Sequence, residues 1–185
     1  MVGAQQNAAP SHTPHWPAHA TVDVWIDLKD IPPSGDRLVE KAMQTWTKAS
    51  AGQLTLRRTL VRSDAAIRVS FVNETANYGE TLPHINRTTG LIDQAEVEIA
   101  AVVPVEPFTR QIVAYLTALH ELGHAVGLEH TTNFSDIMYL FRRPDDGARY
   151  FANYRALLRS ADDIGSATAT GLSADDVKAL AELYK

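Results

Sequence analysis

The stretch HELGHAVGLEH, residues 120–130, places three histidines and two glutamates within eleven positions. On a helix, residues four apart lie on the same face, so the imidazoles of His120 and His124 can reach one ion together. Glu121 lies one step round the helix, close to that ion but turned too far to bind it as a ligand. This is the HExxH arrangement, in which two histidines bind zinc and the glutamate is the general base.

A catalytic zinc needs a third protein ligand and a position left open for water. His130 can be the third ligand only if the helix ends before it, and Gly127 permits such a sharp exit because it tolerates positive φ. The chain contains no cysteine, so a metal must rest on His, Asp and Glu. The alternative is an amphipathic helix rich in histidine by chance, in which each buried imidazole would need its own hydrogen-bond partner.

The composition is that of an ordinary globular domain. The chain has 185 residues, 45% of them hydrophobic, and a formal net charge of -5. It has no basic patch, which excludes a nucleic-acid partner, and no apolar run long enough to span a membrane. The first residues lack the charged and apolar regions of a signal peptide.

Hydrophobic periodicity predicts strands and helices in the first half of the chain and a more helical second half. The segment 73–90, rich in Asn, Thr, Gly and Pro, predicts a loop. The predicted strands cover residues 20–28, 54–60, 65–72 and 94–101, and the predicted helices cover 36–49, 109–127, 148–158 and 173–185.

The predicted strand QAEVEIAA, residues 94–101, alternates cleanly between apolar and polar side chains. One apolar and one polar face are typical of a strand with one side in solvent, and we expect it at a sheet edge. Residues 1–20 are polar and rich in alanine and proline, which predicts a loosely ordered lead-in.

The zinc stretch resembles the extended signature of the metzincin clan of metallopeptidases. That clan has a methionine-containing turn beneath the zinc, and SDIMY supplies Met138 eight residues after His130. Within the clan the sequence is most similar to matrixins. Three further stretches carry that similarity, HWPAHATVDVWID at 15–27, AAIRVSF at 65–71 and LSADDVKALAELY at 172–184.

The resemblance implies an α+β fold with an active-site cleft between two lobes. The upper lobe, residues 21–127, would hold a twisted mixed β-sheet and two long helices. The lower lobe, residues 128–185, would be smaller and mostly helical. Residues 21–185 would then form one catalytic domain, in which Asp176 bonds to the methionine turn.

The implied activity is that of a zinc-dependent metalloendopeptidase acting on proteins or peptides. His120, His124 and His130 would hold one zinc ion, and Glu121 would take a proton from the zinc-activated water and deliver it to the leaving amine. The substrate would pair with the expected edge strand by β-augmentation. The strand residues concerned are Ala95, Glu96, Val97, Glu98 and Ile99.

The resemblance also implies a secreted or periplasmic protein, which we expect to be a monomer. Matrixins carry a structural zinc bound by several histidines before the edge strand, but only His84 occurs there. Asp93 and nearby carbonyls could bind calcium, although no EF-hand-like spacing is present, so calcium is left open.

Two other function classes remain as alternatives. One is a zinc-stabilised protein-binding module with this fold and little turnover, which would have no chemical need for Glu121. The other is an aminopeptidase that trims single residues, which would need an acidic or blocked cleft end to hold the substrate amine.

Overall fold

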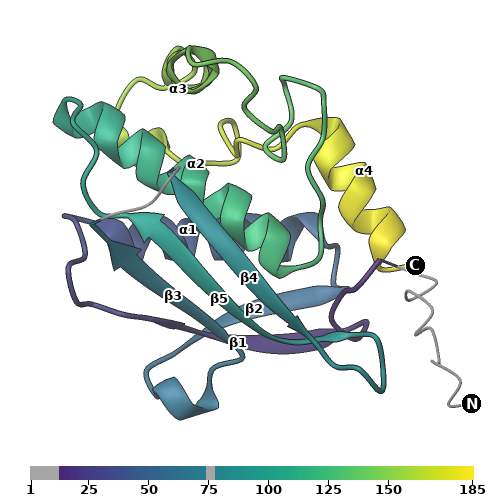
Figure 1. The fold of residues 1–185 in the computed structure, drawn as a ribbon. Helices are drawn as coiled ribbons and strands as arrows, with labels where there is room; N and C mark the ends of the chain where they lie inside the picture. The colour runs from purple at the N-terminus through teal and green to yellow at the C-terminus, as the bar shows by residue number, and fades with distance from the viewer. Residues whose placement is uncertain (1–12, 74–77) are drawn as a thin grey trace, which may run out of the picture.

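The computed structural model describes residues 13–73 and 78–185 of the chain. Its strands are β1 (Ala20–Ile26), β2 (Leu54–Thr59), β3 (Ile67–Val72), β4 (Gly79–Ile85) and β5 (Ile92–Ala100). They form one sheet in the order β2-β1-β3-β5-β4 (Figure 1). The neighbours β2, β1, β3 and β5 are parallel, and β4 runs antiparallel to β5 at one edge of the sheet.

The predicted alternation of apolar residues places one face of the sheet in the core. In β1 and β5 every second side chain is buried, and the residues between them are more exposed. Branched apolar side chains at this spacing pack well on a pleated surface, which favours strands here. The buried members are Val22, Val24, Ile26, Ala95, Val97 and Ile99.

Two long helices, α1 (Gly35–Ala49) and α2 (Pro107–Ala125), cover that apolar face of the sheet (Figure 1). Trp46 of α1 is completely buried, and its indole N–H donates to the carbonyl of Leu119 in α2 at 2.8 Å. The two helices are therefore joined in the core by a hydrogen bond to the residue just before His120.

The chain beyond α2 is mostly irregular, with the helices α3 (Asp146–Arg155) and α4 (Ala174–Leu183). Ser173 and Asp176 form a reciprocal capping box at the start of α4. The Tyr184 hydroxyl donates to the carbonyl of Val126 at 2.9 Å, which ties the end of the chain to the end of α2. The expected α+β fold, with a mixed sheet, two long helices and a smaller helical part, is confirmed.

The expectation of a loosely ordered lead-in is wrong for residues 13–20. Trp16 is buried, with 5% of its surface exposed, and its indole N–H donates to the carbonyl of Ala125 at 2.8 Å. A hydrogen bond from Ile92 N to the carbonyl of His15 holds the same segment against β5. A buried tryptophan contributes a large apolar contact area, and its indole N–H has a hydrogen-bond partner here, so this side chain helps to hold the polar stretch in place. Residues 1–12 lie outside the described part.

The expected position of β5 at the sheet edge is also wrong. It lies between β3 and β4, and the edge is formed by β4, within the segment predicted to be a loop. The β5 residues that the sequence suggested for substrate pairing have a strand on both sides, so they cannot pair with a substrate. They are Ala95, Glu96, Val97, Glu98 and Ile99. The polar face of β5 is exposed because the helices cover only the other face, and not because the strand is at the edge.

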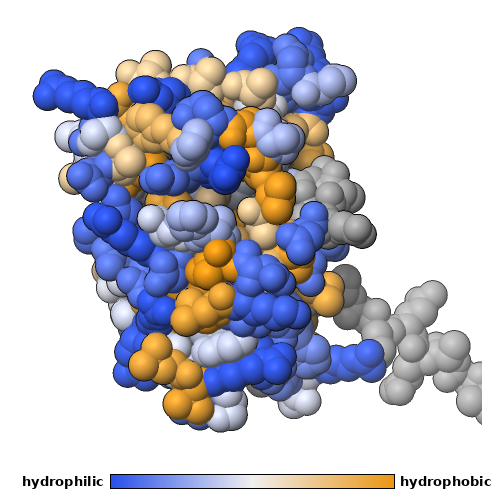
Figure 2. Space-filling view, turned by 90° about the vertical axis from the view of Figure 1, so that its left-hand side faces the viewer, coloured by the Kyte–Doolittle hydropathy of each residue, from blue (hydrophilic) through white to orange (hydrophobic). Residues whose placement is uncertain are grey.

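The surface is mixed in polarity. Figure 2 shows one face on which hydrophobic residues form small groups among hydrophilic ones. The most exposed large apolar side chains include Leu60, Leu82 and Val102. Such scattered residues are normal for a soluble surface. Within residues 13–73 and 78–185, no helix is long and apolar enough to cross a membrane.

Candidate active site

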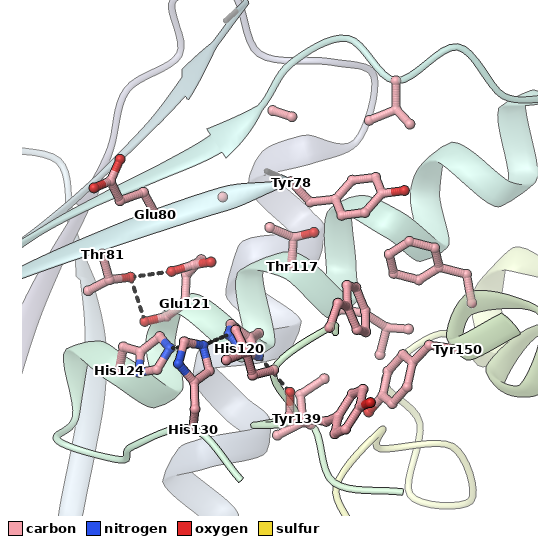
Figure 3. Close-up of a pocket in the computed structure, with 18 of the residues that line it drawn as sticks. Tyr78, Glu80, Thr81, Thr117, His120, Glu121, His124, His130, Tyr139 and Tyr150 are labelled. Carbon is pink, nitrogen blue, oxygen red and sulfur yellow. Dashed lines mark hydrogen bonds between the residues drawn. The ribbon is translucent and has the colours of Figure 1, made fainter. Parts of the chain in front are cut away.

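The three predicted histidines converge at the carboxyl end of α2 (Figure 3). His120 and His124 project from the same face of the helix. The helix ends at Ala125, and Gly127 then turns the chain with a φ of 104°, as the sequence predicted. This turn brings His130 back, so that its Nε2 atom lies 3.3 Å from His120 Nε2 and 3.1 Å from His124 Nε2.

Two backbone carbonyls determine which nitrogen of each helical imidazole carries the proton. His120 Nδ1 lies 2.6 Å from the carbonyl oxygen of Ile137, and His124 Nδ1 lies 2.8 Å from that of Leu128. A carbonyl oxygen can only accept, so each Nδ1 is the protonated donor. The Nε2 lone pairs are thereby directed toward the shared centre, as metal-binding histidines require.

The imidazoles are neutral near pH 7. Burial lowers the pKa of His120 to about 4, against the opposing effect of its hydrogen bond to Ile137. Burial also lowers the pKa values of His124 and His130. Neutral imidazole is the form that binds metal, so these shifts prepare the group for an ion.

The arrangement fits zinc. Two nitrogens bound to one tetrahedral zinc at about 2.0–2.1 Å lie about 3.3 Å apart, close to the separations of His130 Nε2 from the other two. Without a cation, the Nε2 atoms of His120 and His124 present lone pairs to the same small space, and one imidazole N–H cannot satisfy both well. A metal ion that accepts a lone pair from each of the three nitrogens removes this conflict.

Glu121 extends from α2 toward the edge strand β4 and is 5% exposed. The hydroxyl Oγ1 of Thr81 lies 2.7 Å from its Oε2 atom. Burial raises the pKa of Glu121 to about 7, and the bond from Thr81 opposes that rise. A cation beside the carboxyl would lower this pKa. The position is that of a group able to take up and release a proton near neutral pH.

Comparison with known proteins agrees with the geometry. The sequence model of the family described as Matrixin matches residues 28–153, which contain the three histidines, Glu121 and Met138. The chain belongs to the matrixin family. Interstitial collagenase from Equus caballus is 28% identical to this matrixin over 138 residues. That match covers 68% of the chain but only 28% of the collagenase, so the chain spans little more than a quarter of that relative.

The methionine turn of this matrixin lies directly under the histidines. Met138 is 1% exposed, and a Cβ atom added at Gly123 would lie 2.4 Å from its sulfur. A side chain at that point of α2, between the two helical histidines, would have to displace the buried Met138 sulfur. Asp176 accepts hydrogen bonds from the backbone N–H groups of Ile137 at 2.9 Å and Met138 at 3.4 Å, which matches the role expected from the resemblance.

A large cavity opens beside the histidines, between β4, α2 and the segment around α3. Its volume is about 720 Å³, enough for a large side chain with part of its backbone. Tyr78, just before β4, meets Phe151 of α3 with ring centroids 5.0 Å apart, so aromatic rings reach across the cavity from both sides. Its aromatic lining consists of Tyr78, Tyr139, Phe141, Tyr150 and Phe151.

Sequence reasoning did not find the residues that β4 contributes. A Cβ atom added at Gly79 would lie 2.8 Å from Glu121 Cγ, so the strand can approach the helix only with glycine there. Thr81, which lies in the same strand as Gly79, holds the Glu121 carboxyl by a hydrogen bond. The signal that could have revealed the strand is Pro83 followed by the turn-forming run at 86–90, because proline is tolerated in sheets mainly on edge strands.

His84 and Asp93 lie together in the β4–β5 hairpin, away from the three histidines. His84 Nδ1 lies 2.5 Å from Asp93 Oδ1, and the Asn86 amide donates to Asp93 Oδ2 at 3.2 Å. These bonds occupy the carboxylate that the sequence suggested for calcium.

Proposed function

We propose that this matrixin is a zinc-dependent metalloendopeptidase in which Glu121 is the general base. The observation that carries the proposal is the convergence of three imidazole Nε2 atoms, two of them aimed by backbone carbonyls, beside a buried carboxyl. His120, His124 and His130 would hold the ion. When bound, zinc supplies a Lewis acid that polarises the scissile carbonyl and acidifies water.

Glu121 moves the proton in this mechanism. Thr81 holds its Oε2 atom, so the carboxyl keeps one orientation and receives the proton at Oε1. The same carboxyl then passes that proton to the leaving amine. Burial disfavours the charged carboxylate, which favours uptake of the proton.

The substrate would lie along β4, in place of the β5 strand expected from the sequence. The edge strand offers free backbone groups for β-augmentation, and Thr81 and Gly79 bring it against Glu121. The aromatic cavity would then take an apolar side chain next to the bond that is cut. A peptide held over several residues favours cleavage within a chain, that is, an endopeptidase.

The alternative, a zinc-stabilised binding module, explains less. Such a module would gain nothing from burying the Glu121 carboxyl, whose desolvation is unfavourable. A location outside the cytoplasm and a monomeric state are parts of the proposal that rest on the family resemblance.

The test is cleavage of an unfolded protein and a quenched-peptide library by wild type and Glu121→Gln, both loaded with equal zinc. We expect the isosteric change to lower kcat by about 10²–10⁴-fold, because amides do not act as bases near neutral pH. The matched control is Glu182→Gln, an exposed carboxylate in α4 that should cleave like wild type. Equal activity of wild type and Glu121→Gln would refute the role of Glu121.

Equal zinc binding by both proteins with no cleavage by either would instead favour the binding module. A chelator provides the second arm. It should abolish cleavage and lower the melting temperature of the wild type, and added zinc should restore both.

A further inference from the structure

The backbone of β5 shows which groups of β4 face solvent. The N–H groups of Ala95 and Ala101 donate to the carbonyls of Ala66 and Val72, both on the β3 side. Between them, the N–H of Ala100 donates to the carbonyl of Tyr78, on the β4 side. Odd-numbered residues of β5 therefore bond toward β3, and even-numbered residues bond toward β4.

This alternation fixes the orientation of Pro83. It lies opposite Ala95, whose backbone groups point the other way, so the two form a pair without hydrogen bonds between them. The carbonyl of Pro83 consequently points to the free edge of the sheet. The position where an N–H would point to that edge is occupied by the proline ring, which has no N–H.

The free edge of β4 is thus unequal along its length. Gly79 and Thr81 lie opposite Ile99 and Val97, so by the same alternation both their N–H and C=O groups face outward. At Pro83 only the carbonyl remains. A peptide added to this edge can exchange two hydrogen bonds with Thr81, but it can only donate one to Pro83.

The two ends of this edge serve different sides of the histidines. Gly79 borders the aromatic cavity, and Pro83 borders a second hollow. Thr81, His124 and His130 line both, so the boundary between the two falls at Thr81. The loss of a donor therefore affects only the part of a substrate that lies away from the aromatic cavity.

We propose that Pro83 is a specificity-determining residue. Because of it, the edge strand both donates hydrogen bonds to the substrate main chain and accepts them from it only on the Gly79–Thr81 side. This inference rests on the proposed function, because it takes a peptide along β4 as the ligand. The substrate residue opposite Pro83 has a carbonyl without a partner from the strand. Binding therefore depends on the stretch beside the aromatic cavity, and lengthening a peptide past Thr81 adds little.

A proline at this position also discourages pairing with the edge of a second protein copy. That effect needs no substrate, so it predicts that the effect of Pro83 on peptide binding does not depend on peptide length. The two explanations are therefore separable by experiment.

The experiment measures binding of fluorescein-labelled, leucine-centred peptides to zinc-loaded Glu121→Gln protein by fluorescence anisotropy. The peptides are lengthened one residue at a time, at the amino end in one series and at the carboxyl end in the other. The comparison is with Pro83→Ala in the same background, which restores the edge N–H. The control is Leu82→Ala, because the Leu82 side chain is 70% exposed and its backbone groups bond toward β5.

We expect Pro83→Ala to lower Kd about two- to twelvefold in one series only, once the peptide reaches residue 83, as one added hydrogen bond predicts. The shortest peptides should bind equally to both proteins, and Leu82→Ala should change neither series. An equal Kd at every length, or a shift that is the same at every length, would overturn the inference.

A second measurement does not depend on the variant. With proline kept at position 83 of the Glu121→Gln protein, single peptide carbonyls are replaced by methylene groups along the sequence. Loss of the peptide carbonyl opposite Thr81 should weaken binding, whereas loss of the carbonyl opposite Pro83 should not. Equal weakening at every position would overturn the inference. Binding that follows this pattern without cleavage by wild-type protein would refute the proposed function alone. Cleavage with a flat length series would refute this inference alone.

Discussion

The Thr81 hydroxyl oxygen lies 2.7 Å from Glu121 Oε2 and 2.9 Å from the backbone carbonyl oxygen of Glu121. These two residues are 40 positions apart in the chain, one on the edge strand and one on the helix that carries the histidines. The contact joins the surface along which we propose that the substrate lies to the carboxyl that we propose as the base. A shift of the edge strand would therefore also shift the carboxyl.

Removing the hydroxyl should reduce turnover without removing zinc. Thr81→Val keeps the shape and strand propensity of the side chain but leaves the Glu121 carboxyl without its partner. We expect kcat to fall about two- to twelvefold, the value of one hydrogen bond. Steady-state kinetics and zinc stoichiometry measure the two effects separately. Thr81→Ser, which keeps the hydroxyl, should stay close to wild type, and full activity in Thr81→Val would contradict the positioning role.

The fit of Met138 against α2 predicts a coupled pair of substitutions. Gly123→Ala would place a methyl group against the Met138 sulfur, and we expect it to lower the free energy of unfolding by about 1–3 kcal/mol. That loss should exceed the gain of about 1 kcal/mol in helix propensity that alanine brings. Met138→Ala should cost about 2–5 kcal/mol, because it leaves a cavity.

The double variant tests the contact itself. With the methionine shortened, the alanine methyl has room, so the double variant should be more stable than the sum of the single losses predicts. Chemical denaturation of the four proteins measures the coupling. Strict additivity would mean that the Gly123–Met138 contact is not the source of the destabilisation.

Asp176 should matter far more than its neighbour in sequence. It accepts hydrogen bonds from the methionine turn and caps α4, whereas Asp175 is exposed. Asp176→Asn would turn an amide N–H toward one of these donors, and we expect a loss of about 1–3 kcal/mol in unfolding free energy. Asp175→Asn should stay within about 0.5 kcal/mol of wild type. Similar losses in both variants would show that helix-end charge, not the turn, explains the effect.

The hydrogen bonds to the Asp146 carboxylate should make a pH-dependent contribution to the free energy of unfolding. Its Oδ2 atom accepts hydrogen bonds from the backbone N–H groups of Arg142 and Arg143 and from the Tyr139 hydroxyl, at 2.9–3.0 Å. These bonds, that from Arg142 first, hold the pKa of Asp146 below its ordinary value. Because the pKa is lowered on folding, the contribution is present above the unfolded pKa of about 3.9 and is lost as pH falls through the folded pKa.

The measurement compares the melting temperatures of wild type and Asp146→Asn in chelator, so that metal release does not contribute. We expect the variant to melt lower at pH 6, and the difference to narrow as pH falls from about 5 to 3. Asp145→Asn, an exposed neighbour, should show no such narrowing. A constant difference across that range would contradict the assignment.

The convergence of the three histidines could be predicted from the sequence because its geometry is local. The spacing of His120, His124 and His130 and the tolerance of Gly127 for positive φ are contained in eleven residues. The helical period then places two imidazoles on one face, whatever the rest of the chain does. The alternation in β1 and β5 likewise indicated a strand and its buried face, since that pattern also depends only on neighbouring residues.

The sheet edge was decided by tertiary structure. A polar outer face on β5 indicated an exposed face, but alternation does not state which strands pair with which. The short strand β4 carries little apolar periodicity, and its Gly79 and Thr81 acquire a role only where they meet Glu121 of α2. Pairing and close approach between distant segments depend on how the whole sheet packs against its helices. For that reason the histidine triad could be read from eleven residues, whereas the edge strand and the position of Pro83 became visible only in the folded chain.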